Sequence, residues 1–79
     1  MYKKEALSEE FIRFYRLVKK LRVECPWDRE QTHESLRRCL LEETYEVLEA
    51  IDTRDEVELK KELGDLMLQV IFHSVLAEE

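Results

Sequence analysis

The stretch "LEETYEVLEAIDTRDEVELKKELGD" (residues 41–65) decides the fold, because it joins two helical patterns across a short break. The first pattern predicts a helix over about 33–52, with Thr32 as its N-cap. After the break, Asp55 followed three positions later by Glu58 resembles a capping box and predicts a helix from there to the chain end. A turn of two or three residues would then join the two helices as an antiparallel hairpin.

Upstream of this hairpin the sequence predicts one more helix. Ser8, followed by two glutamates, is expected to be the N-cap of a helix over about 8–23. Pro26 cannot extend a helix, so "ECPWDREQT" (24–32) is expected to be the only substantial loop. With one Gly and one Pro among 79 residues, the composition predicts an all-α protein.

The last predicted helix is apolar almost all round. Its apolar residues are Leu59, Leu63, Leu66, Met67, Leu68, Val70, Ile71, Phe72, Val75 and Leu76. Such a helix must be buried on several sides, and a chain this short buries only about 60–65% of its unfolded surface. We therefore expect the N-terminal helix and the hairpin to form a multi-helix bundle completed by oligomerisation, as a homodimer or a tetramer. Close helix packing is the expected reason for Gly64, since glycine costs about 1 kcal/mol in a helix.

Composition excludes several classes of protein. The 13 basic and 19 acidic residues give a net charge of −6, and no basic run is long enough to follow a nucleic-acid polymer. No apolar run approaches the roughly 18 residues of a membrane span, and the N-terminus lacks the apolar centre of a signal peptide. Cys25 and Cys39 match no zinc spacing and are expected to be reduced thiols, which predicts a cytoplasmic location.

Acidic residues gather on one side of the helix predicted over 33–52. Glu42, Glu43, Glu46 and Glu49 fall within an arc of about 120°, opposite a face centred on Leu36, Leu40, Val47, Leu48 and Ile51. Tyr45 and Leu48 are expected to fix this helix to the core. Taken alone, such an acidic stripe is most often a solvated face.

Two further acids change this interpretation. Glu62 and Asp65 lie one turn apart on a side that continues as apolar, and half-buried carboxylates repel one another and lose hydration. Across the hairpin they would face "EETYE" (42–46) and offer several oxygens to a cation. Carboxylates without Cys or His suit Mg²⁺ or Mn²⁺, and these ions favour phosphoryl or nucleotidyl transfer to water.

Three segments together resemble the MazG nucleoside triphosphate pyrophosphohydrolases of the all-α NTP pyrophosphatase superfamily. The segments are "CPWDREQTHESL" (25–36), "LLEETYEVLEAI" (40–51) and "ELGDLMLQVIFHSVLAEE" (62–79). The resemblance implies Mg²⁺-dependent hydrolysis of a nucleoside triphosphate to the monophosphate and pyrophosphate. It also implies that residues 1–79 are a single domain that lacks the C-terminal helix with which family domains continue.

The same resemblance implies roles for five acids. The metal-binding acids of the family fall on Glu42 or Glu43 and on Glu46, Glu62 and Asp65, and we prefer Glu43 to Glu42 as the first of them. Glu42, Glu43 and Glu46 are the catalytic candidates, among which Glu42 would orient water through the metal shell. The general base stays unassigned, and Glu49 lies outside the motif as a solvated residue.

Substrate contacts are expected near Pro26. Trp27 could stack on a base, although packing of the loop is an equal alternative. Lys20 and Arg29 flank the loop and could meet a triphosphate, against the alternative of ordinary surface charge. His33 and His73 are expected to be structural rather than metal ligands.

Two alternatives to the main function stay open. One is a related all-α pyrophosphohydrolase with another substrate, either dUTPase-like or a phosphoribosyl-ATP pyrophosphohydrolase, and "CPWD" (25–28) argues against it. The other is a non-enzymatic helical oligomerisation module, against which the apolar surroundings of Glu62 and Asp65 argue.

Overall fold

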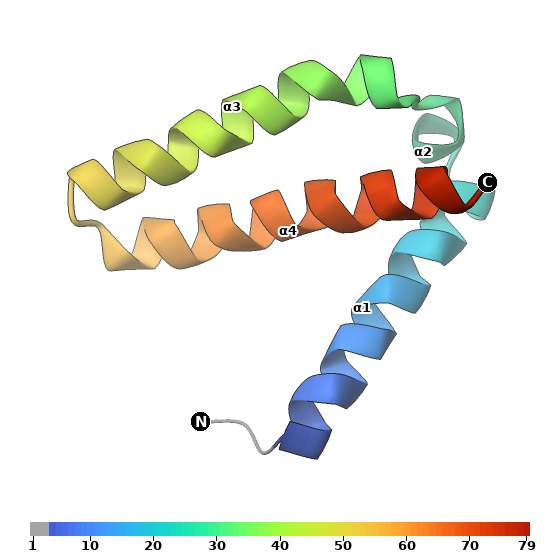
Figure 1. Cartoon of the computed structure of the whole chain (residues 1–79), viewed down its shortest axis with the longest axis horizontal. Helices are drawn as coiled ribbons and strands as arrows, with labels where there is room; N and C mark the ends of the chain where they lie inside the picture. Colours follow the sequence, from blue (N-terminus) through green and yellow to red (C-terminus); the bar gives the residue numbers. More distant parts are fainter. Residues whose placement is uncertain (1–3) are drawn as a thin grey trace. The chain divides into compact units, whose positions relative to one another are not determined.

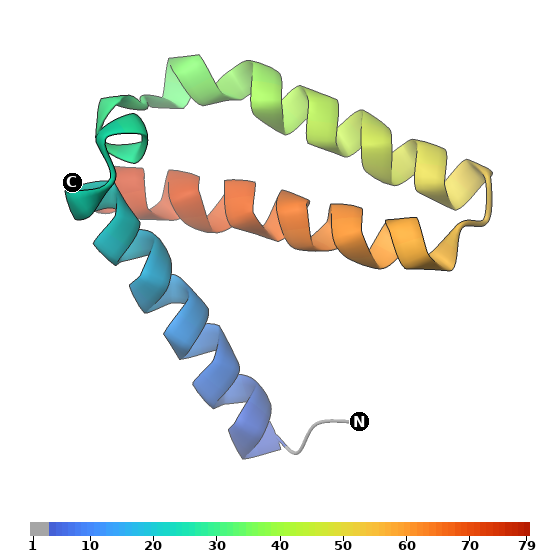
Figure 2. The ribbon, with the colours of Figure 1, turned by 180° about the vertical axis from the view of Figure 1, so that it is seen from behind.

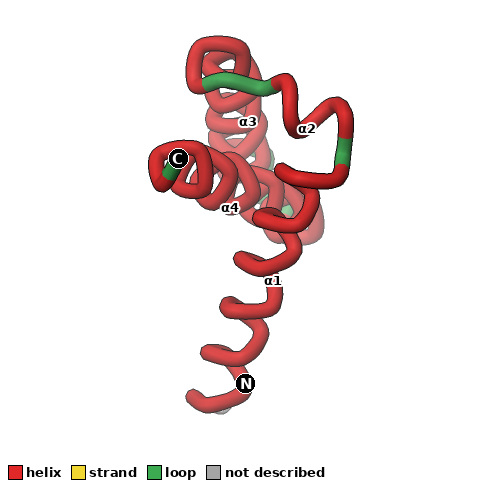
Figure 3. Tube along the Cα trace, turned by 90° about the vertical axis from the view of Figure 1, so that its right-hand side faces the viewer, coloured by secondary structure: helices red, strands yellow, loops and turns green. Residues whose placement is uncertain are grey.

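The computed structural model describes residues 4–79, and over this range it consists of four α-helices with short connections (Figures 1 and 3). The helices are α1 (Lys4–Glu24), α2 (Pro26–Glu30), α3 (His33–Asp52) and α4 (Glu56–Glu78). No strand occurs within residues 4–79, so the all-α prediction is confirmed. The chain forms two compact units, one ending at Glu30 and one spanning Gln31–Glu79.

Helix α1 begins before the predicted cap. Ser8 lies inside the helix, so its predicted N-cap role is wrong. The residues ahead of it, which include Ala6 and Leu7, are strong helix formers and extend the helix toward the N-terminus. The helix ends as predicted just before Pro26, and the Cys25 N–H makes the last hydrogen bond, 2.8 Å to the Leu21 carbonyl.

The predicted loop between α1 and α3 is wrong in part, because α2 forms within it. Pro26 is the first residue of α2, where its missing N–H is not needed. The Arg29 N–H donates to the Cys25 carbonyl at 2.9 Å. The Arg22 guanidinium then donates to the carbonyls of Asp28 at 2.6 Å and Arg29 at 2.8 Å, groups that the end of a short helix leaves unsatisfied. Arg22 therefore ties α1 to α2.

The second unit is an antiparallel hairpin of α3 and α4, which lie side by side in both views of the ribbon (Figures 1 and 2). The hydroxyl of Thr32 accepts from the Ser35 N–H at 3.0 Å, and the Ser35 hydroxyl accepts from the Thr32 N–H at 2.9 Å. This reciprocal capping box fixes the start of α3 where the sequence predicts it.

The turn between α3 and α4 has three residues, as predicted. Arg54 takes the left-handed conformation, with φ of 57°, and the Asp55 N–H then donates to the Ala50 carbonyl at 3.0 Å. An Asp55 carboxylate oxygen accepts from the Glu58 N–H at 3.1 Å, which confirms Asp55 as the N-cap of α4.

The buried side of α3 matches the predicted one only in part, since Leu36 and Val47 are buried whereas Leu48 and Ile51 are exposed. Its buried residues are Leu36, Val47 and Ala50. Leu48 is 48% exposed and Tyr45 is 63% exposed, so the prediction that they fix α3 to the core of this chain is wrong. Helix α3 turns an edge of its acidic stripe toward α4, and that rotation leaves much of its apolar face uncovered.

Helix α4 is only partly covered. Its buried apolar residues are Ile71, Phe72, Val75 and Leu76, all toward its C-terminal end. A Cβ added at Gly64 would meet nothing within 4 Å, so the expected close packing at this glycine is wrong for the chain as described. None of the described helices is both long and apolar enough to cross a membrane.

Candidate metal centre

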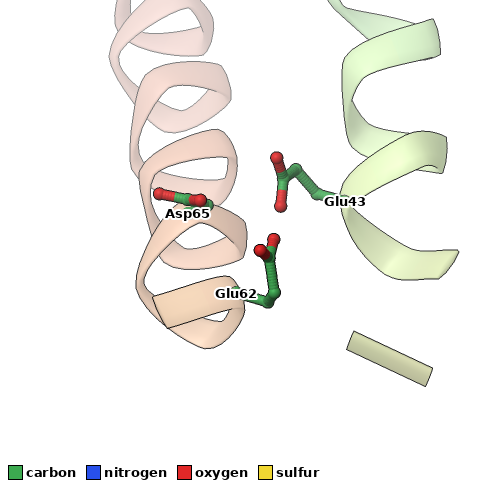
Figure 4. A group of neighbouring side chains, drawn as sticks. All are labelled: Glu43, Glu62 and Asp65. Atoms are coloured by element: carbon green, nitrogen blue, oxygen red, sulfur yellow. The ribbon is translucent and has the colours of Figure 1, made fainter. Parts of the chain in front are cut away.

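Acidic residues from both helices of the hairpin meet in the space between them. Glu43 and Glu46 are spaced three apart on α3, and Glu62 and Asp65 are spaced three apart on α4, so each pair lies on one helix face. Figure 4 shows the carboxylates of Glu43 and Glu62 pointing toward one another, with Asp65 one turn along α4. The antiparallel hairpin therefore brings the acid pair of α3 next to the acid pair of α4.

Three of these acids lie close enough to share an ion. One carboxylate oxygen each from Glu43, Glu62 and Asp65 lies within 4.8 Å of the other two. Mg²⁺ and Ca²⁺ bind oxygens at about 2.0–2.6 Å, so ligands on opposite sides of one ion are roughly 4–5 Å apart. Glu62 is only 6% exposed, and the other two are half-buried.

Unpartnered oxygens give an independent reason to expect a cation. Oε2 of Glu43 and Oε2 of Glu62 are buried, and neither has a hydrogen-bond partner within residues 4–79. Buried polar atoms nearly always have a partner, and a buried carboxylate without one is costly. A divalent ion would satisfy both oxygens, and the all-carboxylate donor set fits Mg²⁺ or Mn²⁺.

The fourth acid, Glu46, contacts the same group. A hydrogen bond with the Glu62 carboxyl, followed by the charge of Glu62, raises the pKa of Glu46 above 4.5. The hydrogen bond from Glu46 lowers the pKa of Glu62, but a second one with Glu43, burial and neighbouring charges outweigh it, so the pKa of Glu62 is raised too. In the metal-free chain, the crowding of carboxylates therefore favours protonation of Glu46 and Glu62.

A pocket of about 420 Å³ adjoins the cluster at the turn end of the hairpin. Its lining residues are Glu46, Glu49, Ala50, Thr53, Asp55, Glu58, Lys61 and Glu62. Lys61 is the one basic residue in this lining, and its charge offsets part of the rise in the pKa of Glu46. The pocket places open space beside two of the candidate metal ligands.

Two acids of the α3 stripe stand apart from the cluster. Glu42 is exposed, and its Oε1 accepts from Arg38 Nε at 3.0 Å, so its carboxylate belongs to a surface ion pair. Glu49 is exposed and lines the pocket, although it is not one of the three acids that converge.

The three predicted substrate contacts belong to the unit that ends at Glu30. Lys20 Nζ lies 3.9 Å from a Glu24 carboxylate oxygen in a surface ion pair. Trp27 is 58% exposed, and the Arg29 carbonyl accepts a hydrogen bond from Arg22. Their contacts with substrate stay a prediction.

A histidine pair at the other end of the hairpin was missed by the sequence interpretation. Nδ1 of His33, at the start of α3, lies 2.8 Å from Nδ1 of His73 on α4. The hairpin register holds the signal that could have found it. If Glu43 faces Glu62 and Asp65, then the residue ten positions before Glu43 on α3 lies opposite a residue about ten positions after these acids on α4.

Comparison with known proteins names the family. Residues 31–79 match the family model described as the MazG nucleotide pyrophosphohydrolase domain. The chain belongs to the MazG family. The matched residues are those of the hairpin unit that carries the acidic cluster, and the predicted family is confirmed.

Several MazG relatives are close in sequence. The chain is 51% identical over 72 residues to a nucleoside triphosphate pyrophosphohydrolase of Mycolicibacterium smegmatis, covering 91% of the chain and 22% of the relative. It is 56% identical over 55 residues to the nucleoside triphosphate pyrophosphohydrolase/pyrophosphatase MazG of Thermotoga maritima, covering 70% and 22%. The corresponding Escherichia coli protein is 53% identical over 55 residues, covering 70% and 21%. The chain thus spans about a fifth of the length of these relatives.

Proposed function

We propose that this chain hydrolyses nucleoside triphosphates to the monophosphate and pyrophosphate with a divalent cation, preferably Mg²⁺, held by Glu43, Glu46, Glu62 and Asp65. The observation that carries the proposal is the convergence of Glu43, Glu62 and Asp65, in which Glu43 and Glu62 each have a buried oxygen without a partner among the described residues. Glu46 joins the group through its interaction with Glu62. The names of the relatives supply the reaction and the substrate class.

The bound ion would neutralise charge on the phosphate oxygens and lower the pKa of the attacking water. Glu43, Glu46, Glu62 and Asp65 would hold the ion, and the adjoining pocket would leave space for phosphate. Within this proposal Glu43 and Glu46 act as metal ligands, and Glu46 also lines the pocket. Glu42 would orient water only after leaving its ion pair with Arg38.

We also propose that the active form is a homodimer or a larger homo-oligomer. The support is the large apolar surface that each helix of the hairpin leaves exposed: Leu41, Tyr45, Leu48 and Ile51 on α3, and Leu63, Met67, Leu68 and Val70 on α4. Monomeric proteins rarely expose so many apolar residues together. A second copy of the hairpin would bury both faces in a helical bundle.

Cellular location follows from the chemistry of the substrate and the thiols. Cys25 and Cys39 are both free thiols, which fits a reducing compartment. The cytoplasm is such a compartment and holds nucleoside triphosphates, so we propose that the enzyme works there.

Pyrophosphate release from a panel of nucleoside triphosphates, dUTP included, with and without Mg²⁺, tests the enzyme. We expect release only with the metal. Glu62→Gln should abolish it, because this change removes a ligand charge while keeping the shape of the side chain. Glu34→Gln, on an exposed part of α3, is the matched control and should keep the wild-type rate. Equal rates for Glu62→Gln and wild type would reject the metal centre.

A further inference from the structure

His33 and His73 make a contact with a defined geometry. Their Nδ1 atoms are 2.8 Å apart, their ring planes differ by 9°, and their ring centroids are 5.0 Å apart. Nearly parallel rings stacked face to face would hold all their atoms at van der Waals spacing, well beyond 2.8 Å. The rings therefore lie side by side and share one hydrogen bond between the two nitrogens.

A hydrogen bond between two Nδ1 atoms needs a proton on one of them, and burial decides which ring carries it. Nε2 of His73 is buried and has no hydrogen-bond partner within the described residues, whereas His33 is exposed. A buried N–H without an acceptor is disfavoured more strongly than a bare acceptor. His73 therefore carries its proton on Nδ1 and donates it, and His33 accepts at Nδ1 with its own proton on Nε2.

We propose that His33 and His73 form a neutral hydrogen-bonded pair with these tautomers, which we call the clasp. We also propose that they are positioning residues for the metal centre. The clasp closes the end of the hairpin opposite the three-residue turn, so α3 and α4 are tied at both ends. Glu43 lies on α3 between the two ties, and their spacing sets how near it comes to Glu62. The positioning role rests on the proposed function, whereas the clasp does not.

Acid should open this clasp. From α3 and α4 the titratable groups that face the pair are its own two rings, and the nearest charged residues along these helices, Glu34, Arg37 and Glu78, are exposed. A further proton on His73 would have to sit on its buried Nε2, which has no acceptor among the described residues. This position costs free energy, so His73 stays neutral in the closed clasp.

Burial, followed by the nearby charge of His33, lowers the pKa of His73. The unfolded chain, with a histidine pKa of about 6.5, therefore takes up the proton first. The contribution of the clasp to stability is complete above about pH 6.5 and is lost as the pH falls through the lowered value.

Long-range ¹H–¹⁵N NMR of the ¹⁵N-labelled chain at about pH 7.5 reads both tautomers directly. We expect the proton of His73 on Nδ1 and that of His33 on Nε2. Two Nε2–H tautomers, or rapid exchange in both rings, would overturn the clasp. This measurement needs no variant and no metal.

Mg²⁺ titration calorimetry tests the positioning role. His73→Ala should weaken Mg²⁺ binding by about 10-fold, the lower end of the loss that follows removal of a group hydrogen-bonded directly to a metal ligand, because His73 acts through the spacing of the two helices. His73→Asn, whose amide occupies the place of Nδ1, should recover part of that loss, and Ser74→Ala is the control on the neighbouring exposed residue. Wild-type affinity in His73→Ala would overturn the positioning role alone. A wild-type chain that binds no Mg²⁺ would overturn that role together with the proposed function. The tautomers seen by NMR would still show whether the clasp forms.

Discussion

Glu43 and Glu62 face each other across the hairpin, and each has a buried carboxylate oxygen without a hydrogen-bond partner among the described residues. Two like charges in this position destabilise the folded chain unless something neutralises them. The pair stands in an otherwise regular hairpin whose ends are well capped. This conflict between charge and burial explains why a cation should stabilise the chain.

Replacing Glu62 with Gln should raise the melting temperature of the metal-free chain and abolish the stabilisation that Mg²⁺ gives. In metal-free buffer the melting temperature should rise, because one repelling charge is gone. The increase in melting temperature that millimolar Mg²⁺ gives the wild type should vanish, because an ion that binds only the folded state stabilises it by mass action. Calorimetry or circular dichroism measures both, with Glu34→Gln as the control that keeps the response. A full Mg²⁺ response in Glu62→Gln would exclude this residue as a ligand.

Metal binding should release protons in mild acid. Because the pKa values of Glu46 and Glu62 are raised, the folded metal-free chain holds these protons more tightly than the unfolded chain does. Their contribution to stability is therefore present at low pH and is lost as the pH rises through the raised values. Mg²⁺ must displace the protons. Titrations in buffers of different ionisation enthalpy should show a release that fades as the pH rises through the raised values, and a release that does not change with pH would contradict the assignment.

Gly64→Ala distinguishes an exposed position from a packed one. If nothing covers Gly64, as in the chain described, alanine should raise the free energy of unfolding by about 1 kcal/mol. Urea unfolding of the wild type and the variant measures this difference. A loss of stability together with weaker self-association would instead place a helix of a second copy against Gly64.

The capping box at the start of α3 should contribute measurably to stability. Thr32→Ala removes the hydroxyl that accepts from the Ser35 N–H and should cost about 1 kcal/mol in the free energy of unfolding. Thr32→Ser keeps an acceptor at the same place and should cost much less. Urea unfolding compares the two variants, and an equal loss in both would show that the cap itself contributes little.

A charge on the exposed apolar side of α3 should prevent association. Leu48 is 48% exposed, and Leu48→Lys would place an ammonium group within the proposed interface. Sedimentation should show a shift from dimer to monomer as the main effect. Val57→Lys, at a position 79% exposed near the start of α4, is the control that should leave association unchanged. A monomeric wild type would contradict the proposed oligomer.

Local sequence signals located the hairpin accurately. Thr32, Asp55 and Pro26 act through hydrogen bonds or steric limits within a few residues, so the helix ends that they set could be predicted. Local signals were not sufficient at Ser8, where strong helix formers ahead of it extend α1, or at α2, where Pro26 opens a helix instead of a loop.

The sequence by itself determined the family, the all-α fold and the acids that converge, because motif spacing and helical periodicity are properties of the chain alone. Only the tertiary structure decided which way α3 is rotated against α4. That rotation buries Glu62 beside Glu43, leaves Leu48 exposed and brings His33 to His73. The physical reason is that a helix carrying apolar residues on more than one side can pack on any of them. The choice depends on the sum of many contacts with the facing helix, which no local pattern records.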